Sequence, residues 1–225
     1  MAVSPKHLKK VVYEQLAVIG KALASPVRLE MIDVLSQGPK TVEVLSTDIG
    51  QSLANTSQHL QVLRSAKLIE AEKSGVYVEY RIADRQVLTL ASLLRRLGES
   101  RLSEIQTLMR MFLEERNLLE IIDCDTLVQR IQQGEVTVID VRPPAEYAAG
   151  HIPNALSVPL EELEQHMDLL PKDREIVAYC RGPLCVMSID AVKVLRSKGL
   201  QATRWEEGVA DWVARGFAPE IGNPA

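Results

Sequence analysis

Apolar side chains in the first 66 residues recur at intervals of three and four, the spacing of amphipathic helices. A first helix is predicted over residues 6–24, and a second begins at Pro26, with Ser25 as its N-cap. Thr41 can cap a short third helix, and Ser52 a fourth that runs to about residue 66. Two short helices joined by a tight turn containing glycine predict a helix-turn-helix.

A β-hairpin is predicted directly after these helices. Two strand-like runs, residues 68–72 and 76–82, flank a turn at Ser74 and Gly75. A hairpin in this position is a wing, and Lys73 near its tip can lie against a phosphate backbone.

The fourth helix carries the polar side chains expected to contact DNA. Leu53, Leu60 and Leu63 are expected to face the core, which turns the polar positions outward. Asn and Gln can pair bidentately with adenine in the major groove, while hydroxyl groups can reach bases or phosphates. His59 can contact a phosphate or belong to a local hydrogen-bond network. The alternative is a merely solvated face; the DNA-contacting set is Asn55, Thr56, Ser57, Gln58 and His59.

A long apolar helix is predicted over residues 85–115, with Gly98 weakening or kinking it. Its ten apolar positions exceed what a small winged domain can cover, so a dimer interface is expected there.

The hydrophobic period changes after Ile122. Runs at residues 135–142, 175–180 and 201–208 suit buried strands, and helical patterns separate them at 125–133, 160–170, 186–198 and 209–215. This alternation predicts an α/β domain with a parallel sheet, whose chemistry gathers at the carboxyl ends of the strands. Cys180 stands at one of those ends.

The loop from Cys180 to Cys185 joins a strand to a helix. Its amides and the start of the helix favour an anion at Cys180, which would lower the pKa of the thiol and make it reactive. Arg181 adds positive charge and Gly182 permits the backbone angles; Pro183 and Leu184 complete the loop.

Other chemistries fit this loop less well. Cys180 and Cys185 with His151 and His166 do not have the spacing of a zinc site, and no metal or other cofactor is expected. A phosphatase-type or arsenate-reductase loop is one residue longer and ends in an arginine, where this chain has Val186.

The N-terminal motifs resemble the ArsR family of bacterial repressors. The segments PVRLEMIDVLSQGPKTVEVLS, NTSQHLQVLRSAKLIE and GVYVEYRI carry the resemblance. It implies a homodimer, paired through its first and last helices, that binds a palindromic operator and releases it when an inducer arrives. The cysteines and histidines of the metal-sensing members are absent: residues 1–118 contain no cysteine, and residues 85–118 no histidine.

The C-terminal motifs resemble the rhodanese family. VIDVRPPAEYAAGHIPNALSVPLEEL, VAYCRGPLCVMS and WEEGVADW match that family in order. The resemblance implies that Cys180 takes a sulfane sulfur as a persulfide and passes it to a nucleophile. Asp140 and Arg142 would be structural or rim residues, with Arg142 paired to Glu146.

Cys185 departs from the rhodanese pattern, which often has a hydroxyl or basic residue there. It can attack the inner sulfur of a Cys180 persulfide, expel hydrosulfide and leave a disulfide, or trap a bridging sulfur. Alternatively it is a small buried hydrophobe. Cys124 is interpreted as an inert packing residue.

Charge and composition divide the chain into two predicted domains, a mainly helical winged helix-turn-helix at 1–118 and a rhodanese-like domain at 119–225. Lys and Arg minus Asp and Glu gives 16 − 13 = +3 for the first and 10 − 17 = −7 for the second. No signal peptide or membrane span is recognisable, and the odd cysteine count disfavours a disulfide framework, so a reducing cytoplasm is expected.

Two hypotheses follow. In the first, the chain is a repressor, and polysulfide, thiosulfate or a persulfide modifies Cys180 and changes operator affinity. In the second, it is primarily a sulfurtransferase whose winged domain serves dimerisation or autoregulation. The segment RNLLEIIDC lacks a flexible Gly/Pro/Ser composition, and coupling through a helix ending near Asn117 favours the first hypothesis.

Overall fold

The protein forms two compact units in a computed structural model that describes residues 4–114 and 121–222. One unit runs to Ala91 and the other begins at Ser92. The division therefore falls inside the long helical segment, earlier than the predicted boundary at 118/119. That boundary, Asn117 and most of the linker RNLLEIIDC lie outside the described residues, so the domain limits stay a prediction.

Four helices build the first unit in the order the apolar spacing predicts. They are α1 (Pro5–Leu23), α2 (Pro26–Leu35), α3 (Val42–Asp48) and α4 (Leu53–Ser65). The hydroxyls of Thr41 and Ser52 accept hydrogen bonds from the third amide beyond each, as N-caps do. Ser25 occupies the N-cap position of α2 but makes no side-chain cap bond. The core lies where α2, α3 and α4 meet, around Met31, Leu45, Leu60 and Leu63.

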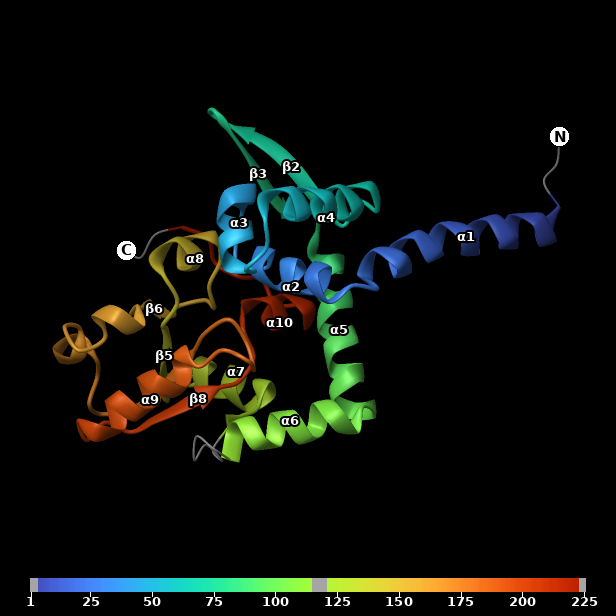
Figure 1. Cartoon of the computed structure of the whole chain (residues 1–225). Helices are drawn as coiled ribbons and strands as arrows, with labels where there is room; N and C mark the ends of the chain where they lie inside the picture. Colours follow the sequence, from blue (N-terminus) through green and yellow to red (C-terminus); the bar gives the residue numbers. More distant parts are fainter. Residues whose placement is uncertain (1–3, 115–120, 223–225) are drawn as a thin grey trace. The chain divides into compact units, whose positions relative to one another are not determined.

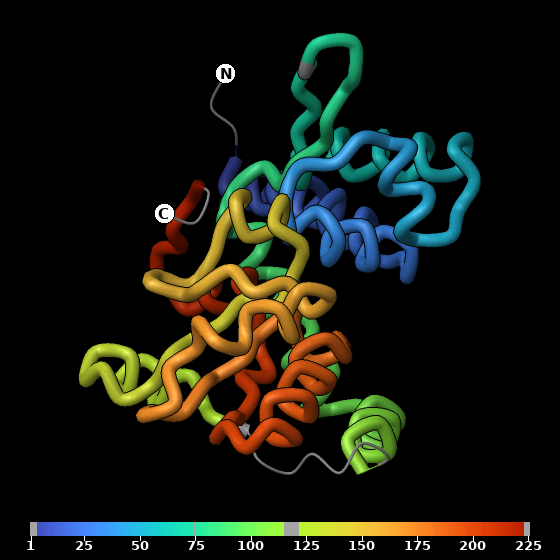
Figure 2. Tube along the Cα trace, turned by 90° about the vertical axis from the view of Figure 1, so that its left-hand side faces the viewer, coloured from blue at the N-terminus to red at the C-terminus, as the bar shows by residue number. Residues whose placement is uncertain are grey.

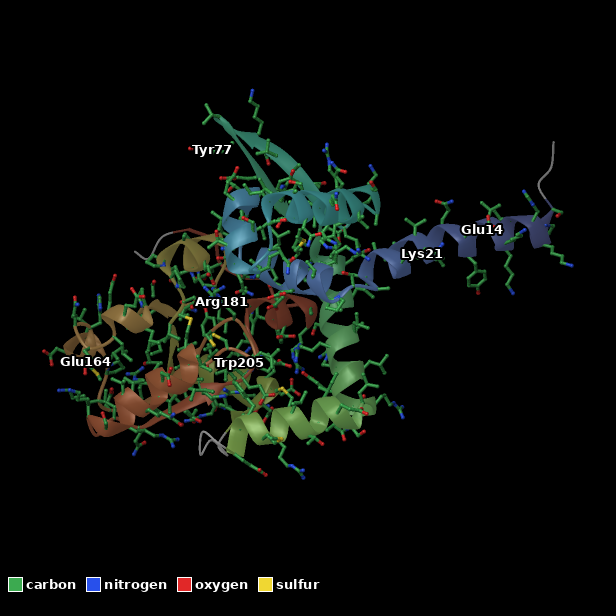
Figure 3. The ribbon with its side chains drawn as sticks, in the orientation of Figure 1. Glu14, Lys21, Tyr77, Glu164, Arg181 and Trp205 are labelled. Carbon is green, nitrogen blue, oxygen red and sulfur yellow. The ribbon has the colours of Figure 1, made fainter. Side chains whose placement is uncertain are left out.

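The predicted wing is a two-stranded hairpin extended by a short third strand. β2 (Ile69–Ser74) and β3 (Tyr77–Ile82) pair antiparallel around Gly75, whose φ of 61° lies in the left-handed region that glycine favours. β1 (Lys40–Thr41), which was not predicted, adds to the other edge of β3. The hairpin projects beyond the helices of its unit, with Tyr77 near its tip (Figures 2 and 3).

The single long helix predicted over residues 85–115 is wrong, because two helices occupy this segment. α5 (Arg85–Arg101) ends before Leu102, and α6 (Ser103–Glu114) turns sharply away from it (Figure 1). The break falls four residues after Gly98. A Cβ at Gly98 would lie 3.2 Å from Cδ1 of Ile105, so the glycine gives α6 room to pack beside the end of α5.

A five-stranded parallel sheet forms the second unit, with the order β4-β8-β7-β5-β6. The three predicted strands are its centre: β5 (Val136–Asp140), β7 (Glu175–Tyr179) and β8 (Ala202–Trp205). Two edge strands of two residues each, β4 (Ile121–Ile122) and β6 (Leu156–Ser157), were not predicted. They are too short to show a hydrophobic period.

Helices connect these strands, and one predicted helix is corrected. α7 (Cys124–Gln132), α9 (Met187–Ser197) and α10 (Val209–Ala214) occur as expected, and α8 (Pro144–Ala149) is additional. The helix predicted over 160–170 is replaced by two 3-10 turns, η1 (Leu160–Glu162) and η2 (Met167–Leu169). Pro171 restricts Leu170 to an extended backbone, and the short turns still bury Leu163 and Leu170.

The two faces of the sheet carry different chemistry because alternate residues of a strand point in opposite directions. Ile176, Ala178 and Cys180 share a core cluster with α9 and with Ala202 of β8. Tyr179 points to the other face, where its ring meets the edge of Trp205 and Trp205 meets Trp212 of α10. The cysteine therefore stands on the α9 face.

Candidate functional site

Cys180 follows the last residue of β7 and precedes α9, at the carboxyl end of a central strand. Its side chain is buried, with 1% of its surface exposed. Its Sγ lies 3.2 Å from Oγ of Ser188 in the first turn of α9 and 3.6 Å from the carbonyl oxygen of Cys185. Strand, loop and helix thus bring their polar groups together around one sulfur.

The hydrogen-bond donors around Cys180 favour the thiolate. Burial by itself raises the pKa of Cys180, but hydrogen bonds from the Cys185 thiol, the Ser188 hydroxyl and the amides of Ser188 and Gly182 outweigh it. Together they lower the pKa to about 6. Roughly nine tenths of the thiol is then ionised at pH 7. The side chain has the ionisation of a nucleophilic cysteine.

Cys185 has the opposite character. Its hydrogen bond to Cys180 and its burial raise its pKa well above the ordinary value, while the amides of Arg181 and Met187 oppose this. The two sulfurs therefore share one negative charge, which resides on Cys180. Cys185 is the proton-bearing partner and lies within hydrogen-bond reach of the nucleophile.

The loop takes its shape from Gly182 and a tight turn. Gly182 has a φ of 147°, and the amide of Cys185 donates to its carbonyl at 3.0 Å. Pro183 is buried, whereas Leu184 is 68% exposed. Arg181 forms an ion pair with Glu146, at 2.6 Å between Nη2 and Oε1. The hydrogen bonds that lower the pKa of Cys180 come from Cys185, Ser188 and Gly182, and the support expected from the charge of Arg181 stays a prediction.

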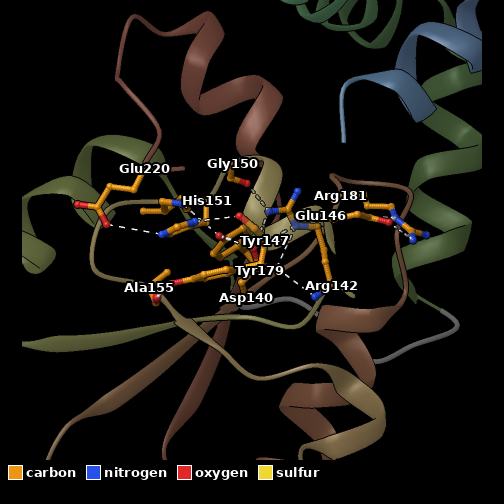
Figure 4. Close-up of polar contacts among 11 residues, drawn as sticks. Asp140, Arg142, Glu146, Tyr147, Gly150, His151, Ala155, Tyr179, Arg181 and Glu220 are labelled. Atoms are coloured by element: carbon orange, nitrogen blue, oxygen red, sulfur yellow. Dashed lines mark hydrogen bonds and ion pairs between the residues drawn. The ribbon is translucent and has the colours of Figure 1, made fainter. Parts of the chain in front are cut away.

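Asp140 and Arg142 form a buried network on the opposite face of the sheet (Figure 4). Arg142 donates to both carboxylate oxygens of Asp140 and to the carbonyl of Gly150, and the Tyr179 hydroxyl donates to Asp140 at 2.7 Å. The predicted pairing of Arg142 with Glu146 is corrected: the ion pairs here join Arg142 to Asp140 and Arg181 to Glu146. Glu146 still raises the pKa of Arg142 through its charge.

Gly208 packs directly against the backbone of the Cys180 loop. A Cβ built there would lie 2.5 Å from the carbonyl oxygen of Arg181 and 2.9 Å from that of Cys180. Its amide lies 3.4 Å from Oδ2 of Asp211. Only a glycine lets the turn between β8 and α10 approach the loop this closely.

Sequence reasoning missed three residues of this site: Ser188, Arg204 and Gly208. Ser188 stands eight residues after Cys180, in the first turn of the following helix, and that spacing could have indicated it. Gly208 lies in the WEEGVADW segment that resembles the rhodanese family, but the resemblance does not indicate its contact with the loop. Arg204 is 1% exposed at the end of β8, and only strand pairing reveals its position.

Cys124 is buried at the start of α7, and burial raises its pKa to about 11, which agrees with an inert packing residue. All three cysteines are free thiols. Within residues 4–114 and 121–222, no cluster of three His, Cys, Asp or Glu side chains could hold a metal ion. No described helix is long and apolar enough to cross a membrane.

Helix α4 presents part of the predicted DNA-contacting set. Gln58 is exposed and Ser57 half-buried, and Lys73 is exposed near the tip of the wing. The Asn55 amide donates to Gln51 at 2.7 Å, and Nδ1 of His59 lies 3.4 Å from Arg28 of α2. His59 therefore belongs to a local network, one of the two roles expected for it.

Two positions on α4 are reversed relative to the prediction. Thr56 is fully buried, because it lies one turn before Leu60 on the stripe that meets the core. Leu53, expected in the core, is 51% exposed at the first residue of the helix. Thr56 is accordingly a packing residue and does not face DNA.

The two domains match known families. A model described as a helix-turn-helix domain matches residues 23–72, and a model described as a rhodanese-like domain matches residues 123–215. The chain belongs to a family of helix-turn-helix transcriptional regulators that carry a rhodanese-like domain. The resemblances to the ArsR and rhodanese families are thereby confirmed, as is the predicted fold class.

Three individual proteins are similar to this chain. The chain is 38% identical over 216 residues to the HTH-type transcriptional regulator Rv0324 of Mycobacterium tuberculosis, covering 96% of this chain and 95% of that protein. It is 36% identical over 104 residues to a sulfurtransferase of Allochromatium vinosum, covering 44% of this chain and 95% of that protein. It is also similar to a homodimeric winged helix-turn-helix DNA-binding domain from Mycobacterium bovis, with 37% identity, 45% and 94% coverage and a TM-score of 0.42.

Proposed function

We propose that this transcriptional regulator detects reactive sulfur through a persulfide formed at Cys180, and that the modification changes its affinity for operator DNA in the cytoplasm. The observation that carries the proposal is the ionised, buried Cys180 in a loop of hydrogen-bond donors. A thiolate at neutral pH attacks sulfane sulfur, and a thiol with an ordinary pKa does so far less.

The chemical step is a sulfur transfer between anions. The Cys180 thiolate attacks the sulfane sulfur of thiosulfate, forming a new S–S bond as the donor S–S bond breaks. The electron pair of the broken bond leaves with sulfite, and the outer sulfur of the persulfide carries one negative charge. With a hydropolysulfide donor the leaving group is hydrosulfide or a shortened polysulfide.

Cys185 is placed to end the persulfide state. Its thiol can attack the inner sulfur, so that a Cys180–Cys185 disulfide forms and the outer sulfur leaves as hydrosulfide with the proton of Cys185. The raised pKa of Cys185 slows this attack, because little of the sulfur is ionised at neutral pH. With a lowered pKa at Cys180 and a raised pKa at Cys185, we expect the persulfide to form readily and to be converted slowly into the disulfide.

The DNA-binding arm of the proposal uses α4 and the wing of a homodimer. The exposed Gln58 and the half-buried Ser57 are the candidates for base and phosphate contacts, and Lys73 is the candidate for a further phosphate contact. α1 extends away from the other helices of its unit with Leu8, Val12 and Leu16 exposed (Figure 1). α5 and α6 also expose leucines. A second copy of the chain would cover these apolar faces.

A contact inside the second unit supports coupling between the thiol and the dimerisation helix. The Asp211 carboxylate of α10 accepts hydrogen bonds from Ser92 at 2.6 Å and from Arg95 at 2.5 Å, both on α5. The same carboxylate lies beside the Gly208 amide, under the carbonyls of the Cys180 loop. A change in the loop can thus reach α5 through two contacts.

The deciding experiment measures operator binding with and without inorganic polysulfide. The wild-type chain is expected to change its affinity about 5- to 100-fold, the usual range of an allosteric coupling, and Cys180→Ser is expected not to respond. The Cys124→Ser variant is the matched control, because it also removes a buried thiol, but one whose pKa is raised and which is not expected to react. This variant should respond like wild type. Equal wild-type affinity under both conditions would remove the proposal.

A second candidate function is sulfur transfer as the main activity. The 36% identity to a sulfurtransferase over the rhodanese-like domain favours it. Transfer of sulfur from thiosulfate to cyanide would then proceed in wild type and stop in Cys180→Ser. Rates equal in the two proteins would exclude this activity, and mass spectrometry would separate a Cys180 persulfide from a Cys180–Cys185 disulfide.

A further inference from the structure

Arg204 is a buried cation to which the described residues offer no hydrogen-bond acceptor. It stands next to last in β8 and is 1% exposed. Within the described part of the chain, no atom accepts a hydrogen bond from Nε, Nη1 or Nη2 of Arg204. The nearest carboxylate, Oε2 of Glu206, lies 3.8 Å from Nη2, too far for a hydrogen bond. Arginine stays charged in proteins, and a buried charge without partners is costly.

Strand pairing places this cation on the face that holds Cys180. Arg204 pairs with Ala178 of β7, two residues before Cys180, so Ala178 and Cys180 point to the same side. Ala202 of β8 packs in the same α9-facing cluster, and alternation puts Arg204 beside it on that side. Four residues later, Gly208 meets the carbonyl oxygens of Cys180 and Arg181. β8 and the turn that follows it at Gly208 therefore pack against the loop that begins at Cys180.

The electrostatics agree with this placement. Burial lowers the pKa of Arg204, while the negative charge of Glu206 and the single negative charge shared by Cys180 and Cys185 oppose that effect. The resting thiolate is held mainly by hydrogen bonds from Cys185, Ser188 and the loop amides. The hydrogen-bonding capacity of the guanidinium is thus left for a further anion.

We infer that Arg204 is a positioning residue that binds the negatively charged outer sulfur of a Cys180 persulfide. This inference rests on the proposed function, because it assigns to the guanidinium of Arg204 the binding of the persulfide that sulfur transfer to Cys180 would form. The guanidinium offers several N–H donors in one plane to a small anion inside a site of low polarity, where charge-assisted hydrogen bonds are strong. Arg181, the arginine of the loop itself, is already paired with Glu146.

The test compares the ratio of persulfide to thiol at Cys180 in the full chain. Each protein is equilibrated with sodium tetrasulfide and sulfide at a fixed ratio, alkylated and weighed by mass spectrometry. Arg204→Met is expected to lower the ratio about 10- to 100-fold, the loss of a hydrogen bond to a charged group. Arg204→Lys should recover most of it, since it keeps the charge. Arg215→Met, which removes an arginine paired with Glu207, should match wild type.

A second readout separates the outer sulfur from the thiolate. The pKa of Cys180, measured from the pH dependence of alkylation, is expected to move less in Arg204→Met than the persulfide ratio does. Equal shifts would mean that Arg204 acts on the thiolate alone, and an unchanged persulfide ratio would mean that it does not act; either result overturns the inference. If wild type gains no sulfur while its thiol titrates as described, the proposed function itself fails.

The wild-type chain provides a measurement that does not depend on folding of the variants. The Nε–Hε resonance of Arg204 is followed by NMR before and after sulfur loading. A new hydrogen bond to an anion should shift it, whereas the resonance of Arg215 should stay in place. An Arg204 resonance unchanged in a chain shown by mass to carry the persulfide would contradict the inference.

Discussion

Ser188 shows how one hydroxyl can set the reactivity of a cysteine. Its Oγ lies 3.2 Å from Sγ of Cys180, and it donates to the ionised sulfur. Without the hydroxyl of Ser188, burial still disfavours the negative charge of Cys180, but one of the hydrogen bonds that offset the effect of burial is lost. The nucleophile should then be less ionised at neutral pH.

We predict that Ser188→Ala raises the pKa of Cys180 by about one unit, the equivalent of one lost hydrogen bond. In wild type, the alkylation rate should be nearly constant above pH 7 and fall as the pH drops through about 6, because protonation removes the thiolate. The variant should lose reactivity at a higher pH and match wild type near pH 9. Ser197→Ala, on the same helix, is the control; a variant profile identical to wild type would show that the hydroxyl does not stabilise the thiolate.

Sequence reasoning succeeded for residues whose role is local. The caps Thr41 and Ser52 act within three residues, and Cys180 follows directly from a strand ending in a glycine-containing loop. It failed for Arg204 and for the partner of Glu146, because these depend on which strands and loops become neighbours. No spacing along the chain distinguishes Arg142 from Arg181 as that partner.

At the scale of one element, helix α4 has a buried polar atom where the sequence predicted a DNA contact. Oγ1 of Thr56 is buried, and no residue in the described ranges offers it a hydrogen bond. A hydroxyl in this position costs free energy that a methyl group does not. The position is therefore suited to an apolar side chain of the same shape.

We expect Thr56→Val to raise the free energy of unfolding by up to about 1 kcal/mol and to leave operator affinity unchanged. Gln58→Ala, two residues further and exposed, should instead weaken operator binding by about 1–3 kcal/mol and leave stability nearly unchanged. Chemical denaturation and DNA titration measure the two effects. Weakened DNA binding in a stable Thr56→Val protein would restore the role predicted from the sequence.

Helices and strands were predicted correctly where the hydrophobic period is long and the element follows it throughout. They were not predicted where tertiary contacts end an element before its hydrophobic period ends. The spacing of α5 and α6 is continuous, and only the packing of Ile105 beside Gly98 shows why the chain turns. In the same way, Leu160, Leu163 and Leu170 have helical spacing, but the segment forms two short turns before Pro171. The two-residue strands β4 and β6 carry no period at all.

At the scale of the whole molecule, Asp211 is the residue through which the loop and α5 are connected. Its carboxylate is nearly buried and binds Ser92, Arg95 and the amide of Gly208. Arg95 has a second partner in Glu99, at 2.9 Å. The two acidic residues can therefore be compared, since only Asp211 also contacts the turn below the loop.

Asp211→Asn is predicted to reduce the sulfur-dependent change in operator affinity while Cys180 still gains sulfur. Loss of the charge should also lower stability by about 1–3 kcal/mol, because Arg95 keeps only one anionic partner. Glu99→Gln should keep the full response. Persulfide formation by mass and DNA affinity are measured on the same samples, and a full response in Asp211→Asn would assign the coupling to another route.

The near-complete burial of Cys180 has a consequence for the signals that the molecule can distinguish. With 1% of its surface exposed, Cys180 is shielded from solvent. We expect a chain of a few sulfur atoms to react with it faster than a bulky disulfide such as glutathione disulfide, unless the loop opens. If Cys180 detects sulfur as proposed, its burial would add selection by reagent size to the reactivity of the thiolate.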